Sequence, residues 1–299
     1  MSVVWTESSN GGDWRLELER DALLPGRSVS GRVGVTASGS VEARGLIVAL
    51  VAVEHWQHRV TTSDGQGHTT TQVKTERREL LREPVEVEAA LTLRPGEARS
   101  WTFELPVPPL GPASLDATVA GVDWTVEAKL DIASGFDSRI ERPVRVVQPV
   151  ALLRAGVVPL GEFALYGPAD ASADAITATV TIDPVPLCSG ERFTANVVLA
   201  SGATRRLQEV RAEIRVKVEA TVSNGLDETI TAWTGSVPII ELAGNRSINV
   251  QGVLDDRALP SIELPHGRAS ATFHVILATA WAADPHLIRD VAIATTLEL

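Results

Sequence analysis

Three histidines gather in the first half of the chain and invite a metal interpretation, at positions 55, 58 and 68. Asp64 and Gly65 suit the tip of a β-hairpin, so that His55 and His58 would precede the tip and His68 would follow it. Side chains three positions apart on a strand point to opposite faces, and the first two histidines therefore cannot readily ligate one ion. We expect surface histidines here and no metal site.

Two further features could support catalysis. Cys188 is the only cysteine, and it lies beside a predicted turn with no neighbouring histidine or basic cluster to activate a thiol. Asp255 and Asp256 form a carboxylate pair that suits a solvated turn. The chain contains no GxSxG elbow, no phosphate-binding glycine loop and no HExxH helix. We expect no catalytic residue, no cofactor and no enzyme activity; a β-sandwich hydrolase or a metal-dependent enzyme is the alternative.

The overall charge and hydropathy limit the partners. The 299 residues carry a formal net charge of −11, with a pI near 5.1, and such a chain is repelled by nucleic acid and by anionic lipid. The longest apolar run is about nine residues, against the roughly 20 that cross a bilayer as a helix. The N-terminus has neither a basic region nor an apolar one, and a single cysteine forms no internal disulfide. We expect a cytoplasmic protein with no integral membrane segment and no nucleic-acid partner.

One stretch, residues 45–53 (GLIVALVAV), is apolar at nearly every position, whereas its apparent counterpart, residues 211–219 (RAEIRVKVE), alternates. Because side chains alternate across a strand, one face of each stretch should meet its own core. The opposite face is charged in the later stretch and apolar in the earlier one. The predicted inward residues are Leu46, Val48, Leu50 and Ala52, with Ala212, Ile214, Val216 and Val218; the predicted outer apolar row is Ile47, Ala49, Val51 and Val53.

Something must cover this outer row, since a patch this apolar does not stay exposed on a monomer. One alternative is a short helix, or residues 76–82 (ERRELLR), which could form about two helical turns and fold over the row. The other is a protein interface, with a client or with a second copy of the chain. On the second alternative, Ile47, Ala49, Val51 and Val53 are the protein-interaction residues.

Landmarks recur across the two halves of the chain. A turn at Pro25–Gly26 is matched by Ser189–Gly190, a hairpin tip at Asp64–Gly65 by Asn224–Gly225, and FELP at 103–106 by IELP at 262–265. Gly31, inside a predicted strand, indicates a close backbone approach. The recurrence predicts a tandem duplication of an all-β unit. We place the first domain at 1–150, with 1–12 as a loose lead-in, an Ala/Pro/Gly-rich linker at 151–175 and the second domain at 176–299.

The ordered motifs resemble those of arrestin-fold proteins. They read LPGRSVSGRVGV (24–35), GLIVALVAVEHW (45–56), RPGEARSWTFELPVP (94–108) and PASLDATVAGVDWTVEAKL (112–130), with Trp124 where a tyrosine is more usual. The resemblance covers residues 14–299. It implies two tandem immunoglobulin-like β-sandwiches of the arrestin type that act as a non-enzymatic adaptor or scaffold. Because sandwiches leave sheet edges open to an extended peptide, our hypothesis is that the protein binds an unidentified protein client through sheet faces and edges, with a homodimer as one candidate form of that interface. The chain is most similar to the bacterial sporulation-control branch, since it lacks the lysine pair and the regulatory tail of receptor-binding arrestins.

Overall fold

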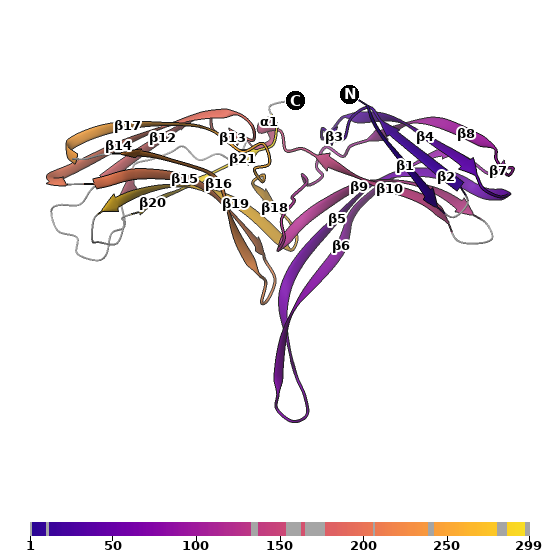
Figure 1. Ribbon diagram of the computed structural model, residues 1–299, viewed down its shortest axis with the longest axis horizontal. Helices are drawn as coiled ribbons and strands as arrows, with labels where there is room; N and C mark the ends of the chain where they lie inside the picture. The colour runs from indigo at the N-terminus through magenta and orange to yellow at the C-terminus, as the bar shows by residue number, and fades with distance from the viewer. Residues whose placement is uncertain are drawn as a thin grey trace. The chain divides into compact units, whose positions relative to one another are not determined.

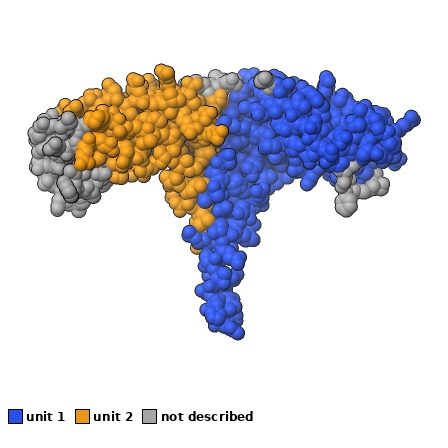
Figure 2. Space-filling model, in the orientation of Figure 1, with its two compact units in different colours: residues 1–148 blue, residues 149–299 orange. Residues whose placement is uncertain are grey.

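The computed structural model describes residues 2–9, 12–132, 137–153, 163–164, 177–205, 207–238, 242–279 and 286–296. These residues are almost entirely β-strand. The chain divides into two compact units, Met1–Gln148 and Pro149–Leu299 (Figure 2). Most of the predicted linker at 151–175 lies outside the described residues, and the domain boundaries proposed from the sequence stay predictions.

Unit 1 is a sandwich of two sheets (Figure 1). Alternation along the strands sends one row of apolar side chains inward from each sheet, and Trp14, Leu16 and Val33 are buried on the first. The first sheet has the antiparallel order β1 (Val3–Ser9), β2 (Gly12–Leu18), β4 (Ser28–Ala37), β8 (Ala98–Pro106). The second has the order β3 (Ala22–Leu23), β10 (Ser138–Val146), β9 (Ala120–Ile132), β5 (Val41–Ser63), β6 (Thr69–Glu88), with β7 (Leu91–Leu93) also paired to β5.

Unit 2 repeats this arrangement in the part of the chain that the structure describes. Its first sheet has the order β11 (Phe163–Ala164), β12 (Thr177–Asp183), β14 (Arg192–Arg205), β17 (Leu242–Val253). Its second has the order β16 (Asp227–Pro238), β15 (Leu207–Ala220), β19 (Gly267–Thr279), β18 (Ile262–Glu263), with β20 (His286–Val291) paired to β19. A short helix, α1 (Val150–Leu153), and a pair of short strands, β13 (Leu187–Cys188) and β21 (Ile293–Ala294), complete it.

The two units share details that confirm the predicted duplication of an all-β sandwich. Among the described residues, each contains a short parallel strand pair, β3 with β10 and β13 with β21. Gly26 and Gly190 have the same left-handed φ of 76°, which glycine adopts without steric cost. Their N–H groups donate to the carbonyls of Val107 and Leu254 at 2.9 and 3.0 Å. The same turn therefore opens the same strand in both units.

One predicted correspondence is wrong. FELP at 103–106 ends β8, which pairs with β4 in the first sheet, whereas IELP at 262–265 begins in β18, which pairs with β19 in the second. The counterpart of β8 is β17, which pairs with β14. The hairpin before it has strands of 14 and 12 residues in unit 2 but 23 and 20 in unit 1. A near-constant sequence offset therefore aligned the wrong segments.

The expected loose lead-in at 1–12 is also wrong. β1 pairs along its whole length with β2, from Val3 opposite Leu18 to Ser9 opposite Gly12. Val3 and Trp5 are half-buried and alternate with exposed neighbours, which is the pattern of an edge strand. The Ser/Asn/Gly content at the end of the segment hid this alternation.

Residues 76–82, expected to form at most two helical turns, belong to β6. The register between β5 and β6 shifts at Ala52/Val53, where Leu81 and Glu79 face consecutive residues and Leu80 is the extra residue of a β-bulge. The bulge interrupts the two-residue alternation of apolar and polar side chains at Leu80. This interruption explains why the segment did not read as a strand.

Two glycines of β4 provide a matched test of the packing between its neighbours. A Cβ on Gly31 would lie 2.3 Å from the Phe103 ring and 2.8 Å from the Glu17 carbonyl oxygen, whereas one on Gly34 would meet nothing closer than 3.5 Å. We expect Gly31→Ala to lower the free energy of unfolding by about 1–3 kcal/mol, and Gly34→Ala to change it by less than about 0.5 kcal/mol. Urea denaturation followed by tryptophan fluorescence measures both, and equal effects would contradict the close approach.

Candidate functional site

The β5–β6 hairpin extends past the body of unit 1 as a two-stranded ribbon (Figures 1 and 2). β9 follows β5 only as far as Trp56 opposite Ala120. From His58 to the tip, β6 is the only strand that pairs with β5 among the described residues. Side chains from Thr61 to Thr75 are exposed, including Val73 at 56%. No second layer of the described sandwich covers this ribbon, so its surface is available to a partner.

Hydrogen bonds at the tip fix the turn that the sequence predicts at 63–68. The Asp64 carboxylate accepts the backbone N–H groups of Gln66 and His68 at 3.0 and 2.8 Å, and it lies 3.1 Å from the His68 ring. These bonds, led by the His68 N–H, lower the pKa of Asp64. Gly67 takes a left-handed φ of 85°. The tip is therefore a defined turn, held by hydrogen bonds to the Asp64 carboxylate.

His55 lies at the root of the same hairpin. Its Nε2 is 3.0 Å from the Ala117 carbonyl oxygen, and its Nδ1 is 3.4 Å from a carboxylate oxygen of Asp123. The neighbouring Asp123 carboxylate raises the pKa of His55, against the opposing effect of burial, and His55 in turn lowers the pKa of Asp123. The imidazole thus joins β5, β9 and the segment before β9.

The histidines of this hairpin do not converge. His55 contacts Asp123 at the root, whereas His68 contacts Asp64 at the tip. Within the described ranges, no cluster of three or more His, Cys, Asp or Glu side chains has the arrangement of a metal site. The expectation that the protein holds no metal and no cofactor stays a prediction.

The other two candidates for catalysis, Cys188 and the Asp255–Asp256 pair, have surroundings that suit a structural role. Cys188 is buried in a small cluster with Val150 and Ala294, and this burial raises the pKa of its thiol, which disfavours the nucleophilic thiolate. Asp255 accepts the backbone N–H of Arg257 at 2.8 Å, and this bond is the main cause of its lowered pKa. The carboxylate therefore caps a turn, as the solvated-turn interpretation predicts.

All four residues of the predicted outer row lie on the outer face of β5, and the cover comes from side chains of the flanking strands. Ala49 and Val51 are 2% and 4% exposed, whereas Ile47 and Val53 are half-buried. Arg82 of β6 lies opposite Val51, and Glu127 of β9 lies opposite Ala49.

An ion pair bridges the row between these two flanking strands. The guanidinium of Arg82 bonds to Glu127 at 2.8 Å and to Glu79 at 3.0 Å. The aliphatic stem of an arginine covers apolar surface while its head stays polar. Residues 76–82 thus contribute to the cover through one long side chain, and not by folding over the face as a helix. Sequence reasoning missed Arg82 and Glu127, because only the strand register shows that they flank the row.

The equivalent face of unit 2 is polar. Arg211, Glu213 and Arg215 alternate along β15 and form ion pairs with one another, with Glu213 bonded to both arginines. The inward row of this strand, from Ala212 to Val218, is fully buried, as predicted. The two units therefore keep the same core pattern and differ in what they present on the opposite face.

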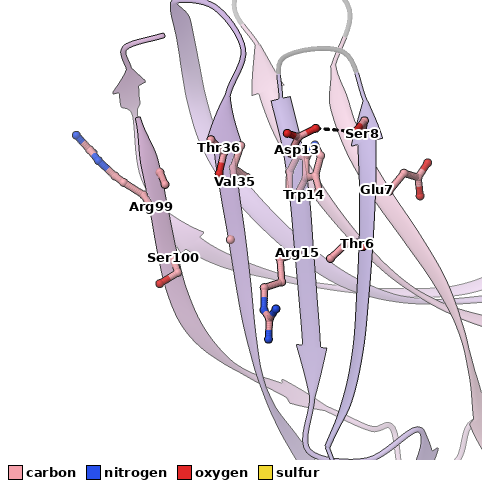
Figure 3. Close-up of a pocket in the computed structure, with 12 residues that line it drawn as sticks. Thr6, Glu7, Ser8, Asp13, Trp14, Arg15, Val35, Thr36, Arg99 and Ser100 are labelled. Carbon is pink, nitrogen blue, oxygen red and sulfur yellow. Dashed lines mark hydrogen bonds between the residues drawn. The ribbon is translucent and has the colours of Figure 1, made fainter. Parts of the chain in front are cut away.

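A depression lies on the outer face of the β1–β2–β4–β8 sheet (Figure 3). Its lining includes Thr6, Arg15, Gly34 and Ser100. Ser8 donates to Asp13 at 2.6 Å across its rim. Arg15 is largely exposed, so the depression is open to solvent. No motif in the sequence points to this depression.

Fold and surface together define the class of protein: two tandem arrestin-type β-sandwiches, the first with an exposed ribbon and a long free strand edge. Residues 13–155 match the family model described as SpoOM protein. The match covers most of unit 1, from residue 13 onward, and supports the resemblance to sporulation-control proteins in that part of the chain. No curated protein matches the chain. None of the described helices is long and apolar enough to span a membrane.

The His55–Asp123 pair should make stability depend on pH. A raised histidine pKa contributes stability that is complete below the unfolded value near 6.5 and is lost as the pH rises through the folded pKa. A lowered aspartate pKa contributes stability above its unfolded value near 3.8, which is lost as the pH falls through the folded pKa. The pair therefore stabilises most between these two values.

We expect Asp123→Asn to bring the pKa of His55 down and to flatten the stability difference between pH 5.5 and pH 8. Titration of the His55 ring resonances by NMR, with thermal unfolding at both pH values, measures the two effects. Asp64→Asn at the hairpin tip is the matched control and should leave the titration of His55 unchanged. A His55 pKa at or below 6.5 in the unmodified protein would contradict the assignment.

Proposed function

We propose that this protein is a non-enzymatic adaptor or scaffold of the bacterial cytoplasm, which binds a partner protein through the β5–β6 hairpin and the free edge of β6, and which self-associates. The observation that carries the proposal is the length of that edge. β6 has 20 residues and ends the order of its sheet. Backbone N–H and C=O groups on such an edge are a template for a further strand.

The distal part of β6 suits strand addition best. Residues 69–73 (TTTQV) carry no charge and consist largely of β-branched side chains, which favour extended backbone. Proteins commonly protect free edges with charged residues or proline, and residues 74–86 of the same strand contain several charges and Pro84. The uncharged stretch is left without that protection, at the exposed end of the ribbon. It is therefore the part of the edge that we assign to a client.

The outer row of β5 belongs to the same proposal as a second contact surface. Ala49 and Val51 have almost no exposed surface left, so a partner would meet Ile47, Val53 and the ion-paired side chains beside them. The family match supports a regulatory role without catalysis. Within the described residues, no cluster of His, Cys, Asp or Glu side chains supports the alternative of a metal-dependent enzyme.

A site-specific photo-crosslinker tests the client-binding ribbon. Val73→benzoylphenylalanine places the probe on the ribbon, and the same substitution at Leu110, which is 94% exposed, provides an exposed control. After irradiation in the native cytoplasm, we expect a discrete crosslinked protein from position 73 and none from position 110. Identical products from both positions would refute the ribbon as the binding site.

A variant with a shortened hairpin provides a second test. Gln57 and Thr75 are paired across the ribbon, so an Asn-Gly turn can join them. This variant lacks the ribbon and should compete poorly with the full-length protein for the client.

A further inference from the structure

The charged part of the β6 edge has a sequence that is complementary to itself when read in the opposite direction. Residues 78–83 read RELLRE. In an antiparallel pair of two such segments centred between Leu80 and Leu81, Arg78 faces Glu83 and Glu79 faces Arg82. Opposite charges that face each other across antiparallel strands are stabilising, and like charges are destabilising. One alignment thus places four opposite-charge pairs across a twofold axis.

The β-bulge makes this alignment compatible with the faces of the sheet. Two copies related by a twofold axis perpendicular to a sheet must pair residues that lie on the same face. Glu79 and Arg82 face Val53 and Val51 on β5, so both lie on the outer face. Arg78 and Glu83 face Glu54 and Leu50, so both lie on the inner side. A regular strand would have put the members of each pair on opposite faces, and the extra residue at Leu80 removes that conflict.

Alignments displaced by one residue lose the complementarity. Moving the centre one way places Arg78 opposite Arg82, and moving it the other way places Glu79 opposite Glu83. Both bring like charges together. The register is therefore specified by charge as well as by the bulge.

Arg78 and Glu83 are available to form an ion pair between two copies. Arg78 is exposed and Glu83 is half-buried, and neither forms an ion pair within the part of the chain that the structure describes. Arg82 already bonds to Glu79 in the same chain, and in a pair of copies these two residues would extend into a four-member cluster. Such a cluster orders side chains that are already partly fixed, which lowers the entropic cost of the new contacts.

We propose that the occupant of the β6 edge at residues 78–83 is a second copy of this chain, paired antiparallel in the register just described. This inference rests on the self-association in the proposed function and adds to it the strand, the register and the ion pairs. In this register residue 73 of one copy faces Glu88 of the other, the last residue of β6, so residues 69–72 lie beyond the paired strands and stay available to a client. Self-pairing also removes the free edge that would otherwise promote uncontrolled association.

Charge reversal of the Arg78–Glu83 pair gives a test with internal rescue. By sedimentation equilibrium of the full chain, we expect a dimer for the unmodified protein and a dissociation constant at least about tenfold higher for Arg78→Glu and for Glu83→Arg, because each places like charges together twice per dimer. The double variant should return to within about threefold of the unmodified protein. Arg77→Glu, with the same change of net charge but Pro84 opposite, is the matched control and should change the constant by less than about threefold.

A mixture of the two single variants separates this register from any other dimer. Arg78→Glu presents two acidic residues and Glu83→Arg two basic ones, so the mixture should form a heterodimer although each variant alone associates weakly. Circular dichroism of every variant checks that the fold is kept. A dimer that is unaffected by the single reversals, or a mixture that does not associate, would overturn the inference and leave self-association through another surface. A monomeric unmodified protein would overturn both, while the crosslinking experiment at Val73 would still decide client binding.

Discussion

The burial of one face of β5 is the constraint on which the rest of unit 1 depends. Leu46, Val48, Leu50 and Ala52 have no exposed surface, and burying a large aliphatic side chain contributes about 1.5–3 kcal/mol. A slip of one residue in this strand would send the whole row to the opposite face. The register with β9 and β6 is therefore fixed, and so are the side chains that those strands place around the outer row.

This fixed register allows the two units to keep one fold and present different surfaces. In unit 2 the outer face of β15 is a ladder of alternating charges that needs no cover. In unit 1 the same face is apolar, and the Arg82–Glu127 ion pair bridges it from the neighbouring strands. The bulge at Leu80 has two consequences for β6. It places Arg82 and Glu79 on the same face for the cover, and it makes the free edge compatible with its own twofold image.

The two-residue alternation along strands and the residue types typical of turns predicted much of this fold. The inward rows of β5 and β15, the hairpin tip at Asp64 and the glycine turns at Gly26 and Gly190 all follow from local patterns, since alternation and left-handed backbone have direct sequence signatures. The all-β duplicated architecture follows from the order of those patterns. Gly31 also lies at a close approach of neighbouring strands, as its position inside a predicted strand indicated.

Features that depend on partners distant in the sequence were not predictable in the same way. β1 became visible as a strand only through its pairing with β2, and the counterpart of β8 was obscured by the different lengths of the two hairpins. The cover over Val51 depends on which residues of β6 and β9 lie beside it. A bulge shifts that relation by one residue, and ERRELLR carries no clear sequence signal of the bulge.

The β5–β6 hairpin has two parts: a root held by the core of unit 1 and a ribbon held by its own cross-strand hydrogen bonds. Hydrogen exchange read by mass spectrometry on the isolated protein distinguishes the two parts. A two-stranded ribbon without a layer behind it is marginally stable in water, so residues 58–72 should exchange by local opening, while residues 46–52 should exchange at rates set by unfolding of the whole unit. Equal, slow exchange in both segments would show that the ribbon is packed against something else and would contradict the account.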